Sequence, residues 1–377
     1  MLAIPTLLFG GTERQLLTLV KALGGGGYDV TVFCYFEYLD EMVGMFKDEG
    51  ADVVLMSPDG HRPPSFPALA RSLFSGIAQV LKVLKPDVVH IQYNAPGSLA
   101  VLFFRLLGAK KIIVTAHTPA STAAGRSKRR WLVPKIVSSM CSAFICVSKT
   151  IESSFFERAP ELFSAALFSK GRKHFTIYNC TELPGMIVAR QARAAEGIVI
   201  GMAARIVHQK GVDIMLRAMP DVLKAVPDAR LLIVGDGDKK DEYRRLADAL
   251  EIADAVEWAG LQSQKAMDGF YARMDILAMP SRFEGFGLTA IEAMGRGVPV
   301  VASDIDGLGE VIENGASGLL VPREDAAALS DAVIVIATNP KMRTRLATGG
   351  RQRVEHLFSC TIFKQKIIGL YSQVLPG

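Results

Sequence analysis

Short apolar runs alternate with amphipathic segments along almost the whole chain, and this alternation limits the folds open to it. The runs at 87–92, 198–203 and 276–279 have the length and apolar character of buried strands. The segments 65–84 and 212–226 carry apolar residues at helical spacing on one face. Strands separated by helices predict parallel strands with crossover helices, so we expect an α/β fold with doubly wound parallel sheets.

The alternation is interrupted by a polar stretch at 191–197, which has the composition of a linker. A chain of 377 residues is long enough for two domains of ordinary size. We therefore predict an N-terminal domain over 1–186, a second domain of the same class over 187–357, and a C-terminal helix within 358–377.

Composition narrows the setting in which such a chain works. Half of the residues are apolar, but no run approaches the ~20 residues that a membrane-spanning helix needs. No signal-peptide pattern opens the sequence, and the five cysteines have no metal-ligand spacing. We expect a cytoplasmic protein whose cysteines are small buried residues in a reducing compartment.

The stretch 275–304 has strand, loop and helix in the order that presents backbone N–H groups to an anionic ligand. The apolar run Ile276–Met279 leads through a glycine-containing loop to a helix that begins at Leu288. Two acids flank the turn, Glu284 in the loop and Glu292 inside the helix. A helix of small and apolar residues has little structural need of Glu292. We interpret both acids as ligand-binding groups, the alternative being a solvated helix face.

Two further turns have the same character. The strand at 198–203 is followed by Arg205 and Lys210, just before the helix at 212–226. Two cations beside a helix N-terminus suit a diphosphate, although a pair of ordinary surface charges is the alternative. Near the start of the chain, Gly10 and Gly11 precede another helix, where glycine allows a ligand to approach the backbone closely.

Together these segments resemble the retaining GT-B glycosyltransferases of family 4. The likeness covers nearly the whole chain and is strongest over 198–322, where the E-x7-E pattern of Glu284 and Glu292 is its most specific part. The other residues that carry it are Gly10–Arg14, Arg205, Lys210-Gly211 and Gly315–Pro322. The resemblance implies two Rossmann-like domains that face each other across a cleft, with the C-terminal helix crossing back onto the first domain.

The resemblance also implies roles for individual side chains. Arg205 and Lys210 would hold the diphosphate of a nucleotide-sugar donor. Glu292 would accept hydrogen bonds from the ribose hydroxyls, and Glu284 would bind hydroxyls of the transferred sugar. Backbone groups would complete the donor site: Gly10 and Gly11 over the phosphates, and Phe286, Gly287 and Leu288 near the sugar.

A histidine beside the donor sugar is a further family feature. His117 follows the strand at 111–115 and matches that position, whereas His90 and His208 are weaker candidates. The resemblance therefore implies a catalytic set of Glu284, His117, Lys210 and Arg205.

The implied reaction transfers a sugar with retention of configuration. The leaving diphosphate oxygen would help to deprotonate the acceptor while the cations stabilise the leaving group. A UDP-sugar is the favoured donor because uridine is the commonest donor base in such enzymes, and GDP-mannose is the main competitor. We expect neither a cofactor nor a metal. We interpret the acids of 236–238 and 304–306 as loop and helix-capping residues, the alternative being a site for a divalent ion.

The positive charge of the chain lies in its first half. Residues 1–186 contain 20 Lys and Arg against 14 Asp and Glu, and the densest basic run is Arg126–Trp131. This run is either an exposed loop or a contact with an anionic membrane, and no nucleic-acid motif accompanies it. We expect a saccharide or lipid-linked acceptor in cell-envelope polysaccharide synthesis, at the inner face of the cytoplasmic membrane. The rival hypotheses are a sugar-nucleotide epimerase or hydrolase on the same scaffold and a non-catalytic glycosyltransferase-like subunit.

Overall fold

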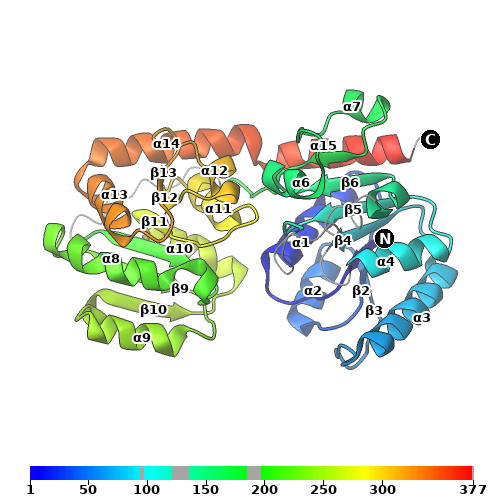
Figure 1. The fold of residues 1–377 in the computed structure, drawn as a ribbon, viewed down its shortest axis with the longest axis horizontal. Helices are drawn as coiled ribbons and strands as arrows, with labels where there is room; N and C mark the ends of the chain where they lie inside the picture. The colour runs from blue at the N-terminus through cyan, green and yellow to red at the C-terminus, as the bar shows by residue number, and fades with distance from the viewer. Residues whose placement is uncertain (94–96, 121–135, 185–196, 376–377) are drawn as a thin grey trace. The chain divides into compact units, whose positions relative to one another are not determined.

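The computed structural model describes residues 1–93, 97–120, 136–184 and 197–375, which form two compact units. The first unit contains Met1–Cys180 and Cys360–Gly377, and the second contains Thr181–Ser359. Each unit has its own sheet and its own apolar core (Figure 1). All but the last residue of the predicted linker at 191–197 lies outside the described residues.

The sheet of the first unit has seven described strands, and every pairing in it is parallel. From edge to edge they are β3 (Asp52–Leu55), β2 (Thr31–Cys34), β1 (Leu2–Ile4), β4 (Val89–Tyr93), β5 (Ile112–Ala116), β6 (Ala143–Cys146) and β7 (His174–Thr176). The strand order reverses between β1 and β4, which is the switch point of a doubly wound sheet.

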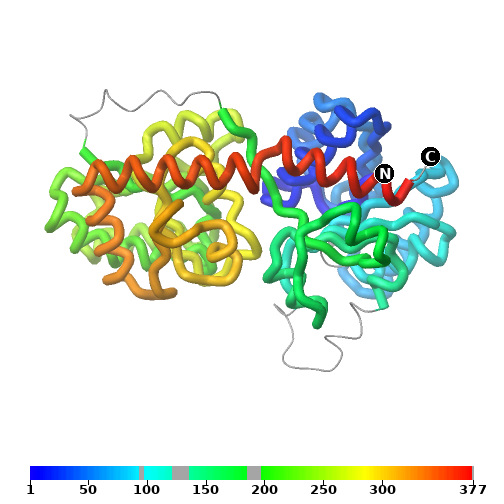
Figure 2. Tube along the Cα trace, turned by 90° about the horizontal axis from the view of Figure 1, so that it is seen from above, coloured from blue at the N-terminus to red at the C-terminus, as the bar shows by residue number. Residues whose placement is uncertain are grey.

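The helices of the first unit come mainly from its N-terminal segment, and one comes from the end of the chain. They are α1 (Gly11–Gly24), α2 (Asp40–Asp48), α3 (Phe66–Leu84), α4 (Gly97–Leu106), α6 (Lys149–Phe155), α7 (Ala165–Ser169) and α15 (Cys360–Val374). Helix α15, red in Figure 2, lies beside α1 and α7. Its residues Phe363, Ile367 and Leu370 are buried in the core of this unit, so the unit is completed by the end of the chain.

The second unit repeats the same topology with six described strands, again all parallel. In order they are β10 (Val256–Gly260), β9 (Arg230–Val234), β8 (Val199–Ala203), β11 (Ile276–Met279), β12 (Val300–Ser303) and β13 (Leu319–Val321). Its helices are α8 (Val212–Ala225), α9 (Lys240–Ala249), α10 (Met267–Arg273), α11 (Leu288–Gly295), α12 (Asp306–Val311), α13 (Ala326–Thr338) and α14 (Pro340–Leu357). The strand order reverses between β8 and β11, so the loops that follow these two strands meet at the switch point.

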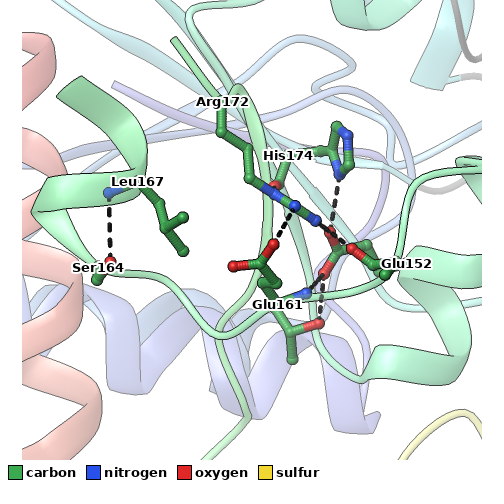
Figure 3. A network of polar contacts seen from close by, with 8 residues as sticks. Glu152, Glu161, Ser164, Leu167, Arg172 and His174 are labelled. Carbon is green, nitrogen blue, oxygen red and sulfur yellow. Dashed lines mark hydrogen bonds and ion pairs between the residues drawn. The ribbon is translucent and has the colours of Figure 1, made fainter. Parts of the chain in front are cut away.

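A buried polar network joins α6 to the edge strand β7 in the first unit (Figure 3). The carboxylate of Glu152, which is fully buried, pairs with Arg172 at 2.8 Å and with the ring of His174 at 2.7 Å. Thr176 donates a hydrogen bond to its other oxygen at 2.7 Å. Arg172 also pairs at 2.7 Å with Glu161, which is partly exposed. The network satisfies every charge that it buries, as a charge inside a protein requires.

None of the helices described in either unit is both long enough and apolar enough to cross a membrane.

Candidate functional site

Two loops of the second unit meet at its switch point and are joined by several hydrogen bonds. Gln209, in the β8–α8 loop, donates to the backbone carbonyl of Phe283 at 2.9 Å and accepts from the backbone N–H of Arg282 at 2.8 Å. At Gly211 the backbone has φ +67°, and a Cβ there would lie 2.0 Å from the carbonyl oxygen of Pro280. Only glycine fits this turn, and its absent side chain allows the two loops to touch.

An ion-pair cluster fixes the outer side of the same two loops. Arg282 binds Asp213 through two hydrogen bonds of 2.8 and 2.7 Å, and it also binds Glu324 at 2.9 Å. Burial alone would raise the pKa of Asp213, but the hydrogen bonds from Arg282 outweigh it, so this pKa is lowered. The bidentate pair is of the stronger kind, and it holds the β11–α11 loop in place against α8.

Lys210 and Glu284, which are 74 residues apart in the sequence, are in contact where these two loops meet. Their side chains form an ion pair that is partly buried, and Ser281 donates to the same carboxylate oxygen at 3.3 Å. Arg205 lies in the same loop as Lys210 and is exposed. The structure therefore places a cation, an acid and a second cation around the ends of β8 and β11.

The helix after Glu284 begins as the sequence predicts. Gly287 precedes the first residue of α11, Leu288, with φ +104°, a conformation that favours glycine. Phe286 is buried and packs edge-on against Phe358 with ring centroids 5.6 Å apart. Their backbone groups thus lie at the N-terminus of α11 next to Glu284, which is the end of a helix that favours an anionic ligand.

Glu292 lies one turn further along α11 and is 5% exposed. Tyr271, from α10, donates its hydroxyl hydrogen to Glu292 Oε2 at 2.7 Å. Arg296 covers the ring of Tyr271 at 5.2 Å from its centroid and donates to the backbone carbonyl of Glu292 at 3.0 Å. Tyr271 was not among the predicted site residues, because nothing in the sequence near it indicates a contact with a residue 21 positions away.

The predicted residues of the first unit follow the carboxyl ends of strands in its own sheet. Gly10 ends the loop between β1 and α1, and Gly11 is the first residue of α1. His117 follows β5 and is partly buried, with its Nε2 2.7 Å from Oε1 of Gln92. Burial lowers the pKa of His117 to about 4, so its ring is neutral at ordinary pH.

The two weaker histidine candidates have different surroundings. His90 is fully buried, with its ring nitrogens 2.8 Å from the Tyr371 hydroxyl and 2.7 Å from the Thr115 hydroxyl, so it serves the core. His208 is exposed in the β8–α8 loop, and its backbone carbonyl accepts from Arg282 at 2.7 Å.

The acidic strings interpreted as loop residues have local partners. Asp236 accepts from the backbone N–H of Gly237 at 2.8 Å and pairs with Lys240 at 2.9 Å. Asp306 is the first residue of α12. Within the described ranges no group of three or more His, Cys, Asp or Glu side chains is arranged to hold a metal ion. The basic run Arg126–Trp131 lies outside the described residues.

Comparisons with known proteins place this fold and site in a family. The profile described as "Glycosyl transferases group 1" matches residues 187–353, and that described as "Glycosyltransferase Family 4" matches residues 9–160. A glycogen synthase of Mycobacterium tuberculosis is 27% identical over 381 residues, covering 93% of this chain and 88% of its own. A GDP-mannose-dependent phosphatidylinositol monomannoside mannosyltransferase of Corynebacterium glutamicum is 35% identical over 179 residues, and the match spans only 46% of that protein.

Solved structures agree on the fold. A sucrose-phosphate synthase from Thermosynechococcus elongatus superposes with a TM-score of 0.77 at 22% identity, covering 99% of this chain and 98% of its own. Anabaena HepE in complex with UDP gives a TM-score of 0.75 at 17% identity over 97% of each chain. The two doubly wound units and these neighbours define a GT-B fold, as the sequence predicts. The chain belongs to the family 4 glycosyltransferases.

Proposed function

We propose that this protein is a retaining glycosyltransferase that transfers a sugar from a nucleotide-sugar donor to a saccharide or lipid-linked acceptor. The observation that carries the proposal is the meeting of Lys210 and Glu284 at the switch point of the second sheet, with Arg205 in one of the two loops and Glu292 in the following helix. Ligands of doubly wound sheets bind outside the carboxyl ends of the strands at this point. Cations for a diphosphate and acids for hydroxyl groups are both present there.

The proposed roles divide the donor among these side chains. Arg205 and Lys210 bind the diphosphate and stabilise the charge that develops on it as the sugar leaves. Glu292 accepts from the ribose hydroxyls, and Glu284 accepts from the sugar while its contact with Lys210 keeps both side chains in place. The diphosphate oxygen takes the proton of the acceptor hydroxyl on the same face of the sugar, which gives retention. The reaction needs neither a metal nor a cofactor in this scheme.

We favour a UDP-sugar as the donor, with GDP-mannose as the competing candidate. A panel of UDP- and GDP-sugars should distinguish them by the shift in melting temperature and by slow hydrolysis of the donor in the absence of acceptor. The correct donor should raise the melting temperature and release its nucleoside diphosphate, and NMR should show the anomeric configuration of the donor in the product. Binding without transfer to any acceptor would favour the non-catalytic subunit, and release of an epimer or of free sugar as the main product would favour the rival enzyme.

A surface of the first unit supports a lipid-linked acceptor. Residues 60–151 contain 13 Lys and Arg but a single acid, Asp87. Within this segment α3 and α4 pack against each other (Figure 1), with Phe74 and Phe103 in edge-to-face contact at 5.3 Å. These two helices carry exposed apolar side chains: Phe66 at 72%, Val83 at 72% and Leu106 at 67% exposure. Exposed apolar side chains in a segment of basic composition suit the surface of an anionic membrane.

Vesicle binding tests this part of the proposal. The protein should co-sediment with phosphatidylglycerol vesicles at low salt, and not with phosphatidylcholine vesicles. The triple variant Phe66→Ser, Val83→Ser, Leu106→Ser should lose most of that binding. A matched control replaces Leu261 and Val335, which are exposed in the second unit, with Ser. Equal binding by the triple variant and the control would show that α3 and α4 do not contact the membrane.

A further inference from the structure

Two cysteines that are 180 residues apart in the sequence lie with their sulfur atoms in contact. The Sγ atoms of Cys180 and Cys360 are 2.9 Å apart, and neither residue is part of a disulfide. Cys180 is buried, whereas Cys360 is partly exposed. A disulfide bond is ~2.05 Å long, so the two sulfurs need to approach each other by less than about 1 Å to form one.

The backbone on both sides of this pair is held in position. The side chain of Gln15 bonds both backbone groups of Cys180, donating to its carbonyl at 2.9 Å and accepting from its N–H at 3.2 Å. Cys360 is the first residue of α15, whose Phe363 and Ile367 are buried in the same core as Cys180. The contact between the sulfurs therefore follows from fixed backbone positions on two separate segments.

The place of the pair in the chain is also specific. The chain leaves the first unit after Cys180 and returns to it at Cys360, so everything between the two cysteines belongs to the second unit. Next to them, the backbone N–H of Thr181 donates to the carbonyl of Phe358 at 3.0 Å. A bond between the two sulfurs would join the two points where the chain passes from one unit to the other.

The other three cysteines, Cys34, Cys141 and Cys146, are buried. Burial raises the pKa of Cys34 to about 12 and that of Cys141 to about 12, and it raises the pKa of Cys146 well above its usual range. Thiols without thiolate character react slowly with oxidants and with disulfides. Oxidation of this protein should therefore be selective for the pair that contains the accessible Cys360.

We propose that Cys180 and Cys360 are a redox-active dithiol that forms a reversible intramolecular disulfide. With a low-molecular-weight disulfide such as oxidised glutathione, the Cys360 thiolate attacks one sulfur, forms a mixed disulfide and releases the first glutathione thiolate. Cys180 then loses its proton, attacks the Cys360 sulfur and releases the second glutathione. Two protein thiols become one disulfide, and the two electrons and two protons reduce glutathione disulfide to two thiols.

Intact-mass and peptide analysis of the full chain tests the proposal. After equilibration with oxidised glutathione, the wild-type protein should lose the mass of two hydrogen atoms, retain three alkylatable thiols of its five, and yield a peptide cross-linked between Cys180 and Cys360. Dithiothreitol should reverse all three changes. The oxidised protein should melt several degrees above the reduced one, because the bond closes a long loop in the unfolded chain.

Three variants complete the experiment. Cys180→Ser and Cys360→Ser should each lose the cross-link and the redox-dependent shift in melting temperature. Cys141→Ser, which removes a buried thiol with a raised pKa, should oxidise like the wild type. A wild-type protein that keeps all five thiols, or that stops at a glutathione adduct on Cys360, would overturn the proposal. So would a cross-link that involves any other cysteine, and these results do not depend on the folding of a variant.

Discussion

At the scale of single residues, the hydroxyl of Tyr271 holds the carboxylate that we assign to the ribose. Its hydrogen bond to Glu292 is 2.7 Å long and buried. Tyr271→Phe keeps the ring against Arg296 and removes this bond, which contributes roughly 1.5 kcal/mol when the acceptor is charged. We expect the donor dissociation constant, measured by calorimetry, to rise about tenfold while turnover of bound donor changes little.

A matched control exists in the same unit. Tyr243→Phe removes a longer contact, 3.5 Å, to Asp213, which lies with Arg282 on the outer side of the loops. This variant should bind the donor like the wild type. Unchanged donor affinity in Tyr271→Phe would show that the hydroxyl of Tyr271 does not contribute to donor binding.

Replacing each of the two acids of the site should affect a different step, either donor binding or turnover. Glu292→Ala removes the proposed ribose contact and should mainly weaken donor binding. Glu284→Ala removes the proposed sugar contact and the partner of Lys210, and it should mainly lower turnover or sugar selectivity. Calorimetry and single-turnover rates on both variants measure the two effects separately. Equal loss of donor affinity in both, with turnover of bound donor unchanged, would defeat the division of roles.

His117 should stay neutral over the working range of pH. Its pKa is lowered to about 4 by burial, and its Nε2 donates to Gln92 Oε1, which leaves Nδ1 as an acceptor. We therefore expect kcat/KM to show no limb from His117 between about pH 5.5 and 8. Gln92→Glu places a carboxylate beside the ring, which raises the pKa of His117. In this variant kcat/KM should be lowered at acid pH and recover as the ring loses its proton with rising pH.

The origin of that limb is checked by a double variant. Adding His117→Asn to Gln92→Glu removes the titrating ring, so a limb caused by His117 must disappear from the pH profile. A limb that persists would belong to another group.

At the scale of secondary-structure elements, the Glu152 network should stabilise the α6–β7 edge of the first sheet in a pH-dependent way. Burial alone would raise the pKa of Glu152, but the hydrogen bonds from His174, Arg172 and Thr176 outweigh it and the pKa is lowered. The stabilisation is therefore complete above the ordinary carboxyl pKa of about 4.3 and is lost as pH falls through the lower folded-state pKa. Glu152→Gln should cost about 3–5 kcal/mol near pH 7, because it leaves buried Arg172 without a full partner.

Urea unfolding of the variant and the wild type, followed by circular dichroism at several pH values, measures this cost. The difference between the two proteins should shrink in acid. Glu161→Gln is the matched control, since Glu161 pairs with the same arginine but is 42% exposed, and it should cost less than about 1 kcal/mol. Similar losses in the two variants would contradict a role for burial.

The elements were largely predictable from the sequence, whereas their contacts were not. The strand Ile276–Met279 and the start of α11 at Leu288 follow from an apolar run and from a glycine before a helix, which are local signals. The short edge strand β7 has three residues and no apolar alternation to reveal it. The contact between Tyr271 and Glu292 depends on how α10 packs on α11, and the one between Gln92 and His117 depends on the register of β4 and β5. Sequence patterns show the faces of elements, but register and packing are properties of the folded chain.

At the scale of the whole molecule, the second unit alone should bind the nucleoside diphosphate of the donor. Arg205, Lys210, Glu284 and Glu292 all lie in Thr181–Ser359, which has its own apolar core. A fragment 181–359 should therefore unfold cooperatively and bind the nucleoside diphosphate of the correct donor. Its affinity should be within roughly tenfold, or about 1.4 kcal/mol, of that of the whole protein, because all four side chains are present in the fragment. It should transfer no sugar.

The first unit should behave differently when it is cut from the chain. A fragment 1–180 lacks α15, and so loses the side chains of Phe363, Ile367, Leu370 and Tyr371 from its core. Burial of one such side chain contributes roughly 1.5–3 kcal/mol, so losing four of them removes about 6–12 kcal/mol, which is comparable to the whole stability of an ordinary domain. Joining residues 360–377 to residue 180 through a flexible linker should restore cooperative unfolding by circular dichroism. If fragment 1–180 alone were as stable as the joined form, α15 would be a surface addition and not part of the core. For the other fragment, a folded 181–359 that bound no nucleoside diphosphate would contradict a donor site contained in the second unit.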